Sequence, residues 1–170
     1  MSEKIYKFDG NKNEKEVCIP SEYTQIGANS FINCSSLTNV TIPNSVVEIC
    51  LQAFRYCSSL QSITIPDSVT KIGCDAFLSC TSLSSVSLSK NIKKIPFYCF
   101  CNCSLKNITI PGNIQKICEY AFLKCPFLKS VTIQNGVKEI GSSAFSFCES
   151  LTSVTIPNSI VKIGDYAFFD

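Results

Sequence analysis

The sequence predicts an α/β repeat solenoid, and three observations support this fold class. Phenylalanine recurs every 22 or 23 residues from Phe31 to Phe168. A cysteine follows three residues after most of these phenylalanines, and a series of apolar residues then recurs at fixed spacing. Self-similarity with a period of roughly 20 to 50 residues is typical of solenoids and repeat arrays. We therefore expect about seven stacked rungs, built from strands and from short or irregular helical turns.

The repeat extends over nearly the whole chain and has the pattern F-x-x-C-x-x-L-x-x-V-x-I-P-x-x-V-x-x-I-G-x-x-A. The phenylalanines that mark its units are Phe31, Phe54, Phe77, Phe100, Phe122, Phe145 and Phe168. One unit is a residue shorter than the others, between Cys103 and Leu105. A partial unit precedes Phe31 and begins at Val17. The sequence thus divides into an N-terminal cap, residues 1–16, and a solenoid, residues 17–170, with an open C-terminal end.

Each part of the sequence predicts a local structure. In residues 1–16 the segments KIYKF and KEVCI flank a DGNKN turn, which predicts a hairpin-like cap. In each unit the V-x-I segment alternates and is β-branched, as strands are. Proline then fixes φ and opens a turn with Asn, Asp or Gly. A second apolar pair, such as Val69 and Ile72, leads into a compact segment whose Ala and Phe are expected to point inward.

One unit cannot fold alone, which explains why there are several. Each rung offers about eight inward apolar groups, worth roughly 1.5 to 3 kcal/mol each when fully buried. The backbone entropy lost on ordering opposes this by about 1 to 2 kcal/mol for every residue. Stacked rungs bury one another's edges, so we expect their strands to pair in parallel at a spacing of about 4.8 Å.

These residues resemble the BspA-like family of leucine-rich repeats, which have 23-residue units. The elements L-x-x-V-x-I-P, V-x-x-I-G and A-F-x-x-C carry the resemblance from Val17 to Phe168. It implies a leucine-rich-repeat solenoid with a parallel β-sheet on its concave face, used to bind proteins rather than for chemistry. Members are often described as surface or secreted adhesion proteins, and others lack an obvious export signal. The departures lie at turns: Ser89 and Gln134 replace the proline, and Cys50, Pro96 and Cys118 replace the glycine.

The 12 cysteines raise the question of a metal site. Cys99, Cys101 and Cys103 alternate in FYCFCNCS, and thiolates are good zinc ligands. The repeat favours another interpretation, because Cys103 belongs to the F-x-x-C column and Cys99 replaces the usual alanine, where a cysteine acts as a small hydrophobe. Only Cys101 falls in a mixed column, which we expect to be half-exposed. We expect no metal or cofactor, but a column of reduced, inward cysteines: Cys34, Cys57, Cys80, Cys103, Cys125 and Cys148.

Residues on either side of the central Val or Ile of each strand should point outward and form a small, polar surface. Strand propensity and solubility are enough to explain this composition, and the alternative is a rigid surface on which a partner docks. Regular Thr columns can also order water, but Ser and Asn interrupt them here. The candidate partner-binding residues of this concave face are Asn39, Thr41, Ser62, Thr64, Ser85, Ser87, Asn107, Thr109, Ser130, Thr132, Ser153 and Thr155.

Positive charge is concentrated between Lys90 and Lys138, where eight lysines accompany one acidic residue, Glu119. The repeat places lysines in columns, so they either splay apart in solvent or form a basic stripe for an acidic protein or an anionic membrane surface. Nucleic acid is not expected, because no Arg cluster or Gly-rich aromatic motif accompanies them. The candidate stripe consists of Lys71, Lys94 and Lys116, with Lys106 and Lys129 in a second column.

The C-terminal rung lacks a polar cap, which terminal repeats usually need for solubility. Four apolar residues are expected to be uncovered there: Ile160, Ile163, Phe168 and Phe169. A two-fold contact with a second copy would cover them in both chains. We therefore expect a homodimer formed through the C-terminal end.

The composition argues against an enzyme. The chain contains no histidine, which removes the commonest general base, and a thiol such as that of Cys101 would lack a base to activate it. No run of 18 apolar residues and no N-terminal signal sequence is present, which predicts a cytoplasmic or membrane-peripheral protein. The expected function is a non-enzymatic protein-protein interaction module. The alternative is a cell-surface adhesin-type protein that binds extracellular or host proteins.

Overall fold

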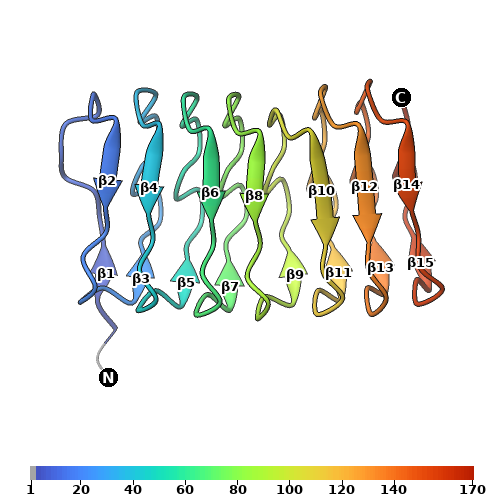
Figure 1. The fold of residues 1–170 in the computed structure, drawn as a ribbon, viewed down its shortest axis with the longest axis horizontal. Helices are drawn as coiled ribbons and strands as arrows, with labels where there is room; N and C mark the ends of the chain where they lie inside the picture. Colours follow the sequence, from blue (N-terminus) through green and yellow to red (C-terminus); the bar gives the residue numbers. More distant parts are fainter. Residues whose placement is uncertain (1–2) are drawn as a thin grey trace.

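The computed structural model describes residues 3–170 as a row of stacked rungs, with the two termini at opposite ends of the row (Figure 1). Each complete rung contributes one strand to each of two columns, here called the long strands and the short strands. All pairings between strands of neighbouring rungs are parallel. The predicted parallel solenoid of about seven rungs is therefore confirmed.

Each long strand begins one residue before the V-x-I segment of its unit and overlaps that segment. They form three separate sheets, in the orders β2-β4, β6-β8 and β10-β12-β14. Their bounds are Glu16–Cys18 (β2), Asn39–Thr41 (β4), Ser62–Thr64 (β6), Ser85–Ser87 (β8), Asn107–Ile110 (β10), Ser130–Ile133 (β12) and Ser153–Thr155 (β14).

The short strands form where the sequence showed only a second apolar pair. They make two sheets, β1-β3-β5-β7 and β9-β11-β13-β15, and the row is interrupted between β7 and β9 (Figure 1). Their bounds are Ile5–Tyr6 (β1), Gln25–Ile26 (β3), Glu48–Ile49 (β5), Lys71–Ile72 (β7), Lys94–Ile95 (β9), Lys116–Ile117 (β11), Glu139–Ile140 (β13) and Lys162–Ile163 (β15).

No helix forms within residues 3–170, so the expected helical turns and the α/β class are wrong. The segment around each Phe of the repeat instead consists of consecutive turns, and from Phe31 to Phe145 the residues two before and two after the Phe have positive φ. Around Phe100 these are Tyr98, at 53°, and Asn102, at 57°. A helix requires negative φ throughout, so this alternation prevents one. It also turns amides toward the next rung: the N–H of Phe77 donates to the carbonyl of Cys99 at 2.9 Å.

Residues 3–18 cover the first rung. β1 pairs with β3 and β2 pairs with β4, each in parallel, and β1 and β2 do not pair with each other. The hairpin expected for residues 1–16 is thus replaced by two strands that extend the solenoid, and residues 1 and 2 lie outside the described part. The rings of Tyr6 and Phe8 stack on Phe31 at centroid distances of 5.8 and 4.9 Å. The core is therefore closed at the N-terminal end by aromatic side chains.

A continuous column of stacked phenylalanines fills the core. The rings of Phe31 and Phe54 lie 4.8 Å apart, and those of Phe145 and Phe168, at the other end, lie 5.3 Å apart. These spacings are close to the distance of about 4.8 Å between hydrogen-bonded strands. Ring stacking and strand pairing therefore favour the same separation of rungs, which helps strands of only two to four residues to form in every rung.

Candidate interaction surfaces

The long strands present the polar surface that the sequence predicted. In β12 the side chain of Val131 is buried, while Thr132 beside it is exposed. Of the twelve candidate residues, eleven are exposed and Ser130 is half-buried. We call this surface the hydroxyl face and define it by Asn39, Thr41, Ser62, Thr64, Ser85, Ser87, Asn107, Thr109, Ser130, Thr132, Ser153 and Thr155.

Strand register aligns the hydroxyl face into columns. In the β10-β12-β14 sheet, Thr109 lies opposite Thr132, which lies opposite Thr155. In the neighbouring column the Ser130 hydroxyl donates to Asn107 Oδ1 at 2.7 Å. Parallel pairing sets the step between such residues at about 4.8 Å. The face is thus a regular array of hydroxyl and amide groups fixed to a hydrogen-bonded backbone.

The structure divides the predicted basic stripe. Lys94 and Lys116 lie in register on β9 and β11, but Lys71 lies on β7, across the interruption between the two sheets. The expected stack of three lysines is therefore not continuous. Lys106 and Lys129 precede β10 and β12, where the N–H of Lys129 donates to the carbonyl of Lys106 at 2.8 Å, so they border the hydroxyl face instead.

Two stripe lysines are already paired with acidic residues. Lys71 Nζ lies 2.7 Å from Glu48 Oε1, and Lys116 Nζ lies 3.0 Å from Glu139 Oε2. The hydrogen bond to each carboxylate raises the pKa of the lysine. When the repeats are aligned, the column that holds these lysines also holds Glu48, one rung before Lys71, and Glu139, one rung after Lys116. The two pairs could therefore have been predicted from the aligned repeats.

Sequence reasoning missed a groove beside the short strands. It has a volume of about 290 Å³ and lies at the interruption between β7 and β9. We call it the lysine groove and define it by Thr70, Lys71, Ile72, Lys93, Lys94, Gln115 and Lys116. Lys93, which was not among the predicted residues, precedes β9 and is exposed. The signal that could have revealed the groove is Pro96, at a position where the repeat has glycine.

The alternating cysteines are buried and unsuited to nucleophilic chemistry. Cys99, Cys101 and Cys103 are at most 7% exposed, so the half-exposed position expected for Cys101 is wrong. Burial raises the pKa of Cys101 to about 11 and raises the pKa of Cys99 and Cys103 well above the ordinary value. Among residues 3–170 no three Cys, Asp or Glu side chains come together in a group that could hold a metal ion.

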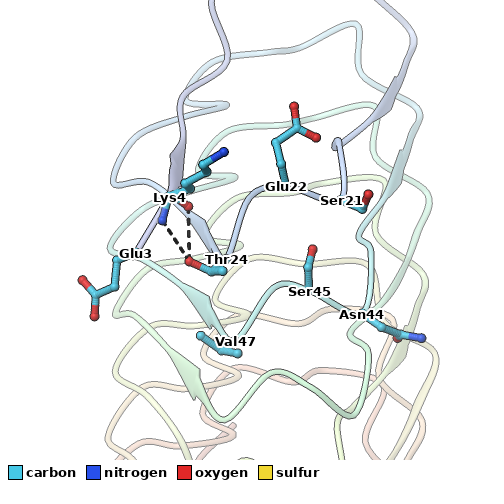
Figure 2. Close-up of a pocket in the computed structure, with 8 residues that line it drawn as sticks. All are labelled: Glu3, Lys4, Ser21, Glu22, Thr24, Asn44, Ser45 and Val47. Carbon is cyan, nitrogen blue, oxygen red and sulfur yellow. Dashed lines mark hydrogen bonds between the residues drawn. The ribbon is translucent and has the colours of Figure 1, made fainter. Parts of the chain in front are cut away.

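A wider hollow lies near the N-terminal end, with a volume of about 730 Å³ (Figure 2). Its wall combines the charged residues Glu3, Lys4 and Glu22 with small polar groups and Val47. The backbone N–H of Lys4 donates to Thr24 Oγ1 at 3.1 Å, which ties the start of the chain to the hollow. Figure 2 shows the Glu3 and Glu22 carboxylates on different sides of the opening. This open, mixed surface brings together no set of groups suited to catalysis.

The C-terminal rung is uncovered in the structure. Ile163 is 49% exposed, whereas Ile140, its register partner one rung earlier, is 1% exposed. Phe169 is 50% exposed, and Ile160 and Phe168 are half-buried. All four residues expected at this end thus present apolar surface to varying extents.

The fold and its surfaces define a class of protein: a parallel solenoid of leucine-rich type, with the apolar columns inside and a polar strand face outside. The family description that matches the chain is the BspA type leucine rich repeat region, with six copies over residues 4–129 and 47–170. The chain therefore belongs to the BspA type leucine-rich repeat family, and the resemblance carried by its sequence motifs is confirmed.

Solved structures agree with this assignment. A leucine-rich repeat protein from Eubacterium ventriosum is 31% identical, with a TM-score of 0.85 over 92% of this chain and 42% of its own. The T. pallidum leucine rich repeat protein is 29% identical, with a TM-score of 0.88 over 94% of this chain and 77% of its own. This chain thus spans less than half of the Eubacterium protein's length. None of the curated proteins compared with the chain matches it.

The strands and turns leave no candidate for a membrane-spanning helix. Within residues 3–170 there is no helix of the length and apolar character needed to cross a membrane.

Proposed function

We propose that this protein is a non-enzymatic interaction module that binds a protein partner through its hydroxyl face and its basic residues. The observation that carries the proposal is the hydroxyl face, where small polar side chains are exposed and held in register over successive rungs. Because the scaffold fixes these groups before binding, docking on them costs little ordering entropy. Membership of a leucine-rich repeat family supports this proposal, because such repeats commonly serve as protein-interaction modules.

The side-chain chemistry favours binding over catalysis. The chain has no histidine, and burial raises the pKa of the core thiols of Cys99 and Cys103. A cysteine nucleophile requires a lowered pKa or an adjacent base. The thiols of Cys99 and Cys103 have the opposite property, which supports a structural role for them.

A capture experiment with three purified forms tests this function. The wild-type chain is immobilised and exposed to an extract of its source cells beside Thr109→Arg/Thr132→Arg, which obstructs the hydroxyl face, and Ser35→Arg/Ser82→Arg. The last form adds the same charge at exposed turn residues outside the long strands and serves as the matched control. We expect at least tenfold less of a specific partner on the hydroxyl-face variant and less than a twofold change on the control. Equal capture by all three forms would exclude the hydroxyl face as the binding surface.

The proposed location is the cytoplasm or the inner face of a membrane. All twelve cysteines are free, and reducing compartments keep thiols in that state. The alternative is an adhesin-type protein at the cell surface, where the same hydroxyl face would meet an extracellular partner. Labelling intact cells with a membrane-impermeant reagent separates the two, because labelling of this chain before lysis would favour the surface location.

A further inference from the structure

The interruption between β7 and β9 has an identifiable cause in the sequence. In the other rungs the residue after the second Ile donates its N–H to the Ile of the preceding rung: Cys118 donates to Ile95 at 2.9 Å, and Gly141 donates to Ile117 at 2.8 Å. Pro96 occupies this position after β9 and has no N–H. The rung of β9 therefore cannot make this bond to Ile72, and here the two sheets of short strands separate.

The separation leaves a backbone donor unused. The residue that precedes each short strand donates its N–H to the preceding rung elsewhere: Thr70 donates to Val47 at 2.9 Å, and Gln115 donates to Lys93 at 2.8 Å. The N–H of Lys93 itself has no acceptor among residues 3–170. Lys93 lines the lysine groove, so this donor lies at a site already rich in positive charge. Backbone N–H groups and lysines together suit carboxylate oxygens.

The charge in the groove is only partly compensated. Glu48 pairs with Lys71 at one side of the groove, and Glu139 pairs with Lys116 at the other. Lys93 and Lys94 lie between these pairs and form no ion pair within the described residues. Within the lysine groove, the uncompensated positive charge thus lies on one rung, with a carboxylate on each side.

The length of the groove limits the size of its ligand. The groove crosses three rungs, whose core phenylalanine rings stack at 5.3 and 5.4 Å, so it extends over roughly 10 Å, close to two strand spacings. An extended peptide rises about 3.4 Å per residue, so about three residues cover this distance. An anionic membrane presents charge over a much wider area, and Glu48 and Glu139 would oppose it at both edges of the groove.

We propose that the lysine groove anchors a short acidic segment of the protein partner, with its carboxylates between Lys93 and Lys94 and near the free N–H of Lys93. The inference rests on the proposed function and identifies the chemistry of the partner. An acidic segment of two or three consecutive residues matches the groove in charge and in length. The hydroxyl face then provides a separate contact on the long strands.

Fluorescence anisotropy with a labelled peptide tests the anchor directly. The probe is an unstructured ten-residue peptide containing Glu-Asp-Glu-Asp, and its control contains Gln-Asn-Gln-Asn. We expect Lys93→Gln/Lys94→Gln to bind the acidic peptide about tenfold more weakly than the wild type. Lys12→Gln/Lys15→Gln removes the same net charge from exposed residues outside the groove and the hydroxyl face and should change binding less than twofold. An equal loss in both variants, or no preference for the acidic peptide, would overturn the proposal.

A second variant tests the groove without changing its charge. Pro96→Gly restores the N–H that the other rungs use and should close the interruption, so we expect at least threefold weaker peptide binding with every lysine retained. Hydrogen exchange reports whether the amide of residue 96 becomes protected. Protection without any loss of peptide binding would contradict the proposal.

Two further outcomes distinguish the acidic anchor from a membrane contact and from binding by the hydroxyl face alone. Binding of the wild type to vesicles containing anionic lipid, without binding to the acidic peptide, would overturn the acidic anchor in favour of a membrane surface. Partner capture that depends on the hydroxyl face, together with failure of the peptide assay, would overturn the anchor alone and leave the proposed function standing.

Discussion

The thiol of Cys103 donates a hydrogen bond to the carbonyl oxygen of Phe77, one rung earlier, at a distance of 3.2 Å. The thiol must be protonated to donate, so the column is suited to a reduced state. The bond also links the cysteine of one rung directly to the phenylalanine of another. The same contact joins Cys57 to Phe31, Cys80 to Phe54, Cys125 to Phe100 and Cys148 to Phe122.

Substitution of Cys103 should show whether its thiol acts as a donor or only as a small apolar group. Cys103→Ala removes both the hydrogen bond and the buried sulfur, so we expect the free energy of unfolding to fall by about 1 to 2 kcal/mol. Cys103→Ser keeps a donor and should cost less. Urea unfolding followed by circular dichroism measures both variants. A serine variant less stable than the alanine variant would indicate that the apolar role dominates.

Alkaline pH should destabilise the fold through its buried thiols. Burial raises the pKa of Cys80 to about 12, whereas an unfolded cysteine titrates at about 8.5. The folded chain thus keeps a proton that the unfolded chain releases. This contribution is fully present below about pH 8.5 and is lost as pH rises toward 12. The urea concentration at the midpoint of unfolding, measured between pH 7 and pH 10, should decrease once the pH exceeds about 8.5. It should decrease less steeply in Cys80→Ser. Identical pH profiles would contradict the prediction.

The turns around each Phe make a prediction about backbone conformation. Lys124 is exposed and has a φ of 56°, a region that β-branched residues strongly disfavour. Lys124→Val should lower the free energy of unfolding by about 1 to 2 kcal/mol, whereas Lys124→Gly fits this φ without strain. Lys106→Val is the matched control, because Lys106 is exposed and immediately precedes a strand. Equal stabilities of the two valine variants in urea unfolding would show that the positive φ carries no such strain.

The same turns show what the sequence could and could not predict about the fold. The columns that contain Phe31 and Val40 repeat with a fixed period, and this periodicity predicted the rungs and their parallel register. Positive φ leaves a weaker signal, because Asn and Gly favour it but Tyr98 and Lys124 occupy it here. These turns were therefore expected to be helical.

The candidate surfaces show a similar division. The hydroxyl face follows from alternation within a strand, which fixes the side to which Thr109 and Ser130 point. The lysine groove depends on a hydrogen bond that one residue, Pro96, cannot make. Its effect lies between rungs, so the sequence indicated only a local change at a turn. The pairing of Lys71 with Glu48, by contrast, follows from the register that the repeat predicted, because the two residues are neighbours in one column.

The exposed C-terminal rung of the 170-residue chain makes a prediction about self-association. Ile163 and Phe169 are each about half exposed, whereas the N-terminal end is covered by Tyr6 and Phe8 stacked on Phe31. Head-to-tail growth would need an open N-terminal end, so we expect two C-terminal ends to meet in a closed dimer. Light scattering at micromolar concentration should give twice the monomer mass, and Ile163→Asp/Phe169→Asp should give the monomer. Val47→Asp/Leu51→Asp, which alters exposed apolar residues away from this end, is the control and should remain dimeric. A wild-type chain that is monomeric throughout this concentration range would contradict the dimer, and a mass that rises continuously with concentration would indicate an open series instead.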